Sequence, residues 1–77
     1  MHRYFFDTEI GDLSVTDSQG IEARDLDHAR DLAVDALPEM LREAVRHGQS
    51  GPVRVKVRDA EGQCRFRAAL VFETETL

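Results

Sequence analysis

Cysteine is nearly absent from this chain of 77 residues, and long hydrophobic runs are absent altogether. The single cysteine, Cys64, excludes an intramolecular disulfide, and no pair of Cys or His residues stands at the spacing of a structural zinc site. The longest apolar run, residues 68–72, is far shorter than the roughly 18 residues that cross a bilayer. The sequence therefore predicts neither a disulfide-stabilised nor a membrane-spanning protein.

A chain this short has room for one compact core, so we expect a single domain over residues 1–77 with little stability to spare. Because disulfides and zinc are excluded, self-association is the remaining candidate for added stability. The opening stretch, residues 1–7, has neither the apolar core nor the small-residue cleavage site of a secretory signal peptide. We therefore expect a cytoplasmic protein, and nothing in the sequence calls for a cofactor.

Alternating apolar and polar residues predict a pair of strands on each side of a central helix. Before the helix, residues 3–8 and 13–16 form a hairpin closed by a Gly-Asp turn, and residues 21–23 either extend the pairing or run extended to the helix. After the helix, residues 53–58 alternate strictly between valine and a basic residue. A short turn leads from there into a last strand over residues 63–73.

The central element is an amphipathic helix that begins after Asp25, a good N-cap, and ends at His47-Gly48. Its apolar residues recur at the i, i+3, i+4 and i+7 positions of one face. Its water-facing side carries a run of carboxylates, which is typical of a solvated surface: Asp31, Asp35, Glu39 and Glu43. Pro38 lies near that side, so we expect a kink rather than two separate helices.

The predicted order of elements is ββαββ. It is most simply satisfied by a four-stranded antiparallel sheet with the helix packed on one face, which is a two-layer α+β domain. The last four residues, 74–77, are expected to fray.

Several features resemble the small bacterial proteins grouped as domain-of-unknown-function family 6894. The chain opens with Met1-x-Arg3-Tyr4-Phe5-Phe6, continues with an Asp17-x-x-Gly20-Ile21-Glu22 turn, and starts its helix with Asp25-Leu26-x-x-Ala29. A valine-rich strand, a second Asp-x-x-Gly turn at residues 59–62 and a closing strand ending in Phe72 complete the pattern over nearly the whole chain. Pro38 departs from the uninterrupted helix that the resemblance implies. The resemblance supports the fold and implies no particular activity.

No catalytic or metal-binding constellation is predicted. The three histidines, His2, His28 and His47, are separated by position, and each lacks an evident partner for catalysis or metal binding. Cys64 is in phase with Phe66 and Leu70, so we expect it to be a small buried apolar residue rather than a nucleophile. The glycines at the turns stand singly, which excludes a glycine-rich phosphate cradle.

The charge distribution is the feature that indicates a function. The chain has a net charge of −5, but its last hairpin has five basic against two acidic residues, a local +3 that leaves −8 elsewhere. Strand alternation predicts that these basic residues share the sheet face that the helix leaves uncovered, with Arg3, Phe5, Ala69 and Val71 beside them. The five are Arg54, Lys56, Arg58, Arg65 and Arg67.

Three interpretations of this basic face are open. It is a solvated surface whose long side chains discourage edge aggregation; or it is a protein interface, either with the acidic helix of a second copy or with another protein; or it binds nucleic acid, with Phe5 as a stacking platform. The negative net charge and the lack of further exposed aromatics weigh against nucleic acid. We predict a non-enzymatic interaction or self-associating accessory module, with nucleic-acid binding as the alternative.

Overall fold

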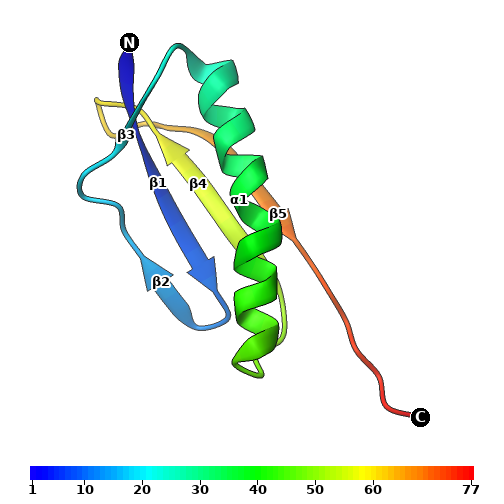
Figure 1. Ribbon diagram of the computed structural model, residues 1–77. Coiled ribbons are helices and arrows are strands. Elements are labelled where there is room, and N and C mark those ends of the chain that lie inside the picture. The colour runs from blue at the N-terminus through cyan, green and yellow to red at the C-terminus, as the bar shows by residue number, and fades with distance from the viewer.

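The computed structural model describes all residues, 1–77, and confirms an α+β fold in which one helix packs on an antiparallel sheet (Figure 1). The elements in chain order are β1 (His2–Ile10), β2 (Leu13–Val15), β3 (Ile21–Ala23), α1 (Leu26–Arg46), β4 (Val53–Arg58) and β5 (Cys64–Leu70). No helix in the structure combines the length and the apolar character that crossing a membrane requires.

The sheet has five strands rather than the four predicted. Its order is β2-β1-β4-β5, and β3 pairs with the first part of β1, where Tyr4 lies opposite Ile21. This is possible because β1 is nine residues long, so one edge of it accommodates β3 near its start and β2 near its end. Of the two alternatives for residues 21–23, the structure therefore shows the first: these residues add to the strand pairing and do not simply run extended to the helix.

The helix α1 begins and ends where its capping residues predict. Asp25 accepts a hydrogen bond from the backbone N–H of His28 at 2.9 Å, which satisfies one of the free donors of the first turn. The last helical residue is Arg46; His47 is the C-cap and is followed by Gly48 in the left-handed conformation. Pro38 lies inside one continuous helix on its exposed side, which confirms a single helix rather than two.

The core lies between α1 and the central strands. Val53, Val55 and Val57 of β4 are at most 2% exposed, and the buried helix residues that pack with them are alanines apart from Leu37. Larger helix side chains, which are partly buried, surround this centre: Leu26, Leu32, Met40 and Leu41. Because alanine adds little bulk, the helix approaches the sheet closely at Ala29, Ala33 and Ala44. The helix contacts every strand except β2 and packs on one face of the sheet, so it leaves the opposite face free of helix (Figure 1).

Strand β5 is shorter than the predicted strand over residues 63–73. Its last residue, Leu70, lies opposite Val53, the first residue of β4, so the chain beyond it has no neighbouring strand to pair with. Residues 71–77 leave the body of the domain as an extended segment, drawn in orange and red in Figure 1. The pairing of β5 with β4 is also interrupted by a bulge, in which Arg65 is the extra residue between Phe66 and Cys64.

Replacement of Pro38 by alanine tests how much the proline inside α1 lowers the free energy of unfolding. The Pro38→Ala variant regains the backbone hydrogen bond to the carbonyl of Val34, so we expect its free energy of unfolding to rise by up to ~3 kcal/mol. Urea denaturation followed by circular dichroism measures this change. The Pro52→Ala variant, which alters a proline outside the helix, should show no such gain; equal effects in both variants would contradict the explanation.

Candidate interaction face on the outer side of the sheet

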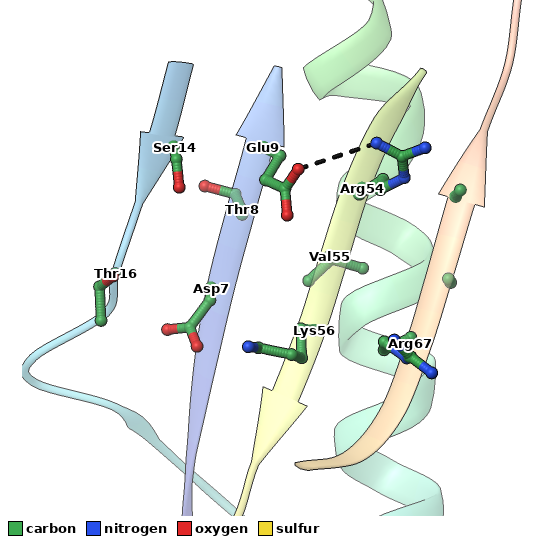
Figure 2. Close-up of a pocket in the computed structure, with 11 residues that line it drawn as sticks. Asp7, Thr8, Glu9, Ser14, Thr16, Arg54, Val55, Lys56 and Arg67 are labelled. Atoms are coloured by element: carbon green, nitrogen blue, oxygen red, sulfur yellow. Dashed lines mark ion pairs between the residues drawn. The ribbon is translucent and has the colours of Figure 1, made fainter. Parts of the chain in front are cut away.

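The outer face, meaning the sheet face opposite α1, is organised in rows by the strand register. Directly paired residues in an antiparallel sheet point to the same side. One row contains Phe5, Arg58 and Cys64, the next contains Asp7, Lys56 and Arg67, and a third contains Glu9, Arg54 and Ala69. Five of the six residues predicted for this face, Phe5, Arg54, Lys56, Arg58 and Arg67, are thereby brought together, and Figure 2 shows part of the arrangement.

Arg58 is bound by contacts within the protein and is only partly exposed to solvent. Its Nε and Nη2 donate to the two carboxylate oxygens of Asp7 at 2.6 and 3.0 Å, and Nη2 also donates to the carbonyl of Asp17 at 2.9 Å. The Arg58 side chain is 23% exposed and that of Asp7 only 15%. The hydrogen bond from Arg58 lowers the pKa of Asp7, and the same bond raises the pKa of Arg58. Arg58 therefore joins β1, β4 and the turn after β2.

Asp17 anchors the turn before β3 on the outer face. One of its carboxylate oxygens accepts from the backbone N–H of Phe6 at 3.0 Å, and the other accepts from the N–H groups of Gln19 and Gly20, both at 3.1 Å. These bonds, that from Phe6 foremost, lower the pKa of Asp17. The backbone N–H of Asp17 in turn donates to Asp7 at 2.9 Å. The turn is thus tied to the strand beneath it at several points.

The second Asp-x-x-Gly turn, between β4 and β5, is built in the same way. A carboxylate oxygen of Asp59 accepts from the N–H groups of Glu61 at 3.0 Å and Gln63 at 2.9 Å. These bonds, led by that from Gln63, lower the pKa of Asp59. Arg65 donates to the other oxygen at 3.3 Å. Strict alternation, which placed Arg65 beside Arg67, is interrupted here by the bulge, and the guanidinium of Arg65 contacts the turn.

Phe5 lies on the outer face as predicted, but its ring is already covered. The guanidinium of Arg58 stacks over it with 5.0 Å between the guanidinium carbon and the ring centre. Phe5 is half-buried, and its ring edge lies close to Gly20. The ring is therefore part of the folded contacts of the turn rather than an open aromatic surface.

Three basic side chains on the outer face remain weakly paired or unpaired, and we call Arg54, Lys56 and Arg67 the basic strip. Arg54 forms one loose ion pair with Glu9 at 3.8 Å, with both side chains more than half exposed. Lys56 and Arg67 are exposed, form no ion pair and lie directly opposite each other on β4 and β5. A shallow groove of about 570 Å³ runs along the strip and continues to Ser14 and Thr16 (Figure 2).

The prediction that Cys64 is buried is wrong. The bulge at Arg65 shifts the alternation of β5 by one residue, so Cys64 pairs with Arg58 and is exposed. Of the histidines, His28 lies at the start of α1, where its Nδ1 accepts from the backbone N–H of Arg24, and His47 lies at its end beside Glu43. No group of three or more His, Cys, Asp or Glu side chains is arranged to hold a metal ion.

Asp7 and Asp17 are the residues of this face that the sequence interpretation missed. Asp7 has the same strand parity as Phe5, which is the signal that could have placed it there. Its partner Arg58 is 51 residues away in the chain, and only the strand register brings the two together. The face is consequently mixed in charge rather than uniformly basic.

Fold and face together define a small α+β domain with an uncovered, charged sheet surface. The chain belongs to the family described as a domain of unknown function (DUF6894), whose model matches residues 3–71. This confirms the resemblance drawn from the opening motif and the two Asp-x-x-Gly turns. No curated protein and no solved structure matches the chain.

Acid should weaken the fold through the hydrogen-bonded aspartates. Because the pKa values of Asp7, Asp17 and Asp59 are lowered in the folded state, the unfolded chain binds protons first as the pH falls. We expect the free energy of unfolding in urea to be constant near neutrality, to decrease below about pH 5 and to continue falling below 3.8, the usual pKa.

The Asp17→Asn variant should be less stable at pH 7 and should show a flatter pH dependence, because it lacks one of the titrating groups. Asp12→Asn is the control, since Asp12 is exposed and forms no side-chain hydrogen bond. If Asp17→Asn and the wild type lose stability in parallel, the role assigned to Asp17 is wrong.

Gly20 is required by both its conformation and its surroundings. It has a φ of +74°, and a Cβ there would lie 2.9 Å from the carbonyl oxygen of Tyr4, whereas a Cβ at Gly62, with a φ of +83°, would meet nothing within 4 Å. We expect Gly62→Ala to cost about 1 kcal/mol of unfolding free energy from backbone strain alone. Gly20→Ala should cost a further ~1–3 kcal/mol. Urea titrations measure both values, and equal losses would argue against the close approach.

Proposed function

We propose that this domain is a non-enzymatic protein-interaction module that binds an acidic segment of another protein along the basic strip. The observation that carries the proposal is the direct opposition of Lys56 and Arg67 on adjacent strands. Like charges in this position raise the free energy of the folded protein unless a counter-charge is present. The carboxylate opposite Lys56 on β1 is Asp7, which is bound through both oxygens to Arg58.

The charges of the rest of the groove favour one position for an acidic peptide. Arg54 adds a third positive charge one row along, and Ala69 lies beside it in the register. On the β1 side, Glu9 and Asp7 line the same groove, and their negative charge repels an acidic segment there. Complementary charge of this kind increases association rates and determines the register of a partner more than it adds affinity. An acidic segment would therefore lie over β4 and β5 rather than over β1.

The same cations also attract phosphate, but no specific observation favours a nucleic-acid strand. Binding of single strands relies on exposed aromatic rings on which bases stack. Phe5, the only candidate on this face, is covered by Arg58. A protein partner is therefore the function that we propose, and the experiment includes an oligonucleotide as its alternative.

Fluorescence anisotropy with two labelled probes, a hexaglutamate peptide and a single-stranded oligothymidine, tests the proposal. We expect the peptide to bind at low salt, and the double variant Arg54→Gln/Lys56→Gln to bind it at least tenfold more weakly. The matched control is Arg42→Gln/Arg46→Gln, which removes the same charge from the exposed side of α1 and should bind like the wild type. Circular dichroism verifies that all three proteins are folded.

Two results would contradict the proposal. If both double variants lose affinity equally, binding follows net charge and not the basic strip. If only the oligonucleotide binds, and it is lost in Arg54→Gln/Lys56→Gln, the face recognises nucleic acid.

A further inference from the structure

Strand β5 has one free edge along its whole length. It is the last strand in the order β2-β1-β4-β5, and β4 is the one strand that it pairs with. Its backbone N–H and C=O groups on that side have no partner in the sheet. Natural proteins usually keep such edges short, cover them or pair them with another strand, because an open edge is a template for pairing.

The chain beyond β5 prolongs this edge. Residues 71–77 run on from the strand in an extended path away from the domain (Figure 1). None of the backbone hydrogen bonds outside the helix and strands involves them. An extended segment without backbone partners, continuous with a free edge strand, is suited to pairing with another strand.

We propose that the protein forms a twofold-symmetric dimer in which β5 and the segment after it pair antiparallel with the same residues of a second copy, with Leu70 at the axis. This interface goes beyond the acidic-segment site proposed above, because it uses the strand edge rather than the outer face. It also closes the open edge, as an isologous contact between two identical surfaces does.

The sequence of the segment is complementary to itself about Leu70. Residues 65–75 read RFRAALVFETE, with arginines on one side and glutamates on the other. Antiparallel pairing centred on Leu70 places Arg67 opposite Glu73 of the second copy, which gives Arg67 the carboxylate that it lacks in the monomer. It also places Ala68 opposite Phe72 and Ala69 opposite Val71, so that each small residue meets a larger one. Such cross-strand pairs are the unit of sheet stability.

Other registers lose part or all of this complementarity. A shift by one residue sets the helix-side residues, such as Phe66 and Leu70, against the outer-face residues, so the two sheets could not continue one another. A shift by two in one direction keeps Arg65 opposite Glu73 but sets Arg67 against Val71; in the other direction it keeps Arg67 opposite Glu75 but sets Glu73 against Ala69. Only the register centred on Leu70 places both Arg65 and Arg67 opposite glutamates, at positions 75 and 73.

The flank of α1 above β5 provides a second, apolar contact. Arg30 stacks over the ring of Phe66 at 5.1 Å, which shows that this flank lies over β5. Val34, Leu41 and Val45 follow Arg30 at helical spacing, and Val34 and Val45 are 48% and 55% exposed. The twofold axis places both helices on the same side of the continuous sheet. The register pairs Phe66, under Arg30, with Thr74 in the extended segment of the second copy, so the first part of the flank faces that segment. Only the last turn of the flank, at Val45, lies near the axis at Leu70, where the second copy would cover its exposed side chain.

Swapping the charges of Arg67 and Glu73, which the proposed interface places opposite each other, provides the test. Light scattering and sedimentation equilibrium over a dilution series measure the mass, which we expect to be twice 8.7 kDa for the wild type. Arg67→Glu sets two glutamates against each other, and Glu73→Arg sets two arginines, so each variant alone should dissociate at least tenfold more readily. An equimolar mixture of the two restores both opposite-charge pairs, and it should recover the dimer, as should the double variant Arg67→Glu/Glu73→Arg.

Each further outcome supports or overturns this interface. A wild type that stays monomeric throughout the series overturns it, as does a dimer that neither single variant weakens. Single variants that are folded by circular dichroism but do not recover the dimer on mixing also overturn it. The Arg54→Gln/Lys56→Gln variant leaves the proposed strand pairing intact and should dimerise like the wild type. If this variant loses peptide binding but still dimerises, the result bears on the acidic-segment site and not on the dimer. The two proposals can therefore succeed or fail separately.

Discussion

The position of β4 between β1 and β5 is the constraint on which the rest of the structure depends. Its alternation of valine and basic residues places three apolar side chains under the helix and three cations on the opposite face. Since both edges of β4 are paired, its neighbours are held in a defined register and the rows of the outer face follow. The alanines of α1 pack against the valines of β4 and complete the core. Strand β4 therefore supports the fold on one face and presents the candidate site on the other.

Arg58 separates the structural part of the outer face from the part open to partners. Its bonds to Asp7 and Asp17 and its stacking on Phe5 hold the turn before β3 over the first row. The cost of ordering these groups is offset because the partly buried charges are paired and hydrogen-bonded. Lys56 and Arg67 have no such partners, and the exposed positive charge of the face is therefore concentrated along β4 and β5.

The two proposed interfaces share Arg67, but they can coexist in one assembly if the acidic partner then binds Arg54 and Lys56. Pairing of two β5 strands would engage Arg67 and would leave Arg54 and Lys56 of each copy exposed on a continuous outer face. The dimer would then present two basic segments related by the twofold axis, and a bivalent acidic partner would bind it more tightly than a single copy. For a domain with a core as small as this one, the second copy would also be a source of added stability.

The sequence by itself determined the local elements: the period of 3.6 predicts α1, the period of two predicts β4, and the aspartate-glycine turns mark the ends of strands. These signals reside in neighbouring residues, so no tertiary information is needed to recognise them. The tertiary structure alone decided the pairing of β3, the exposure of Cys64 and the bond between Asp7 and Arg58. Each of these depends on the register between strands, which one bulge at Arg65 is enough to change, and register is set by contacts between residues far apart in the chain.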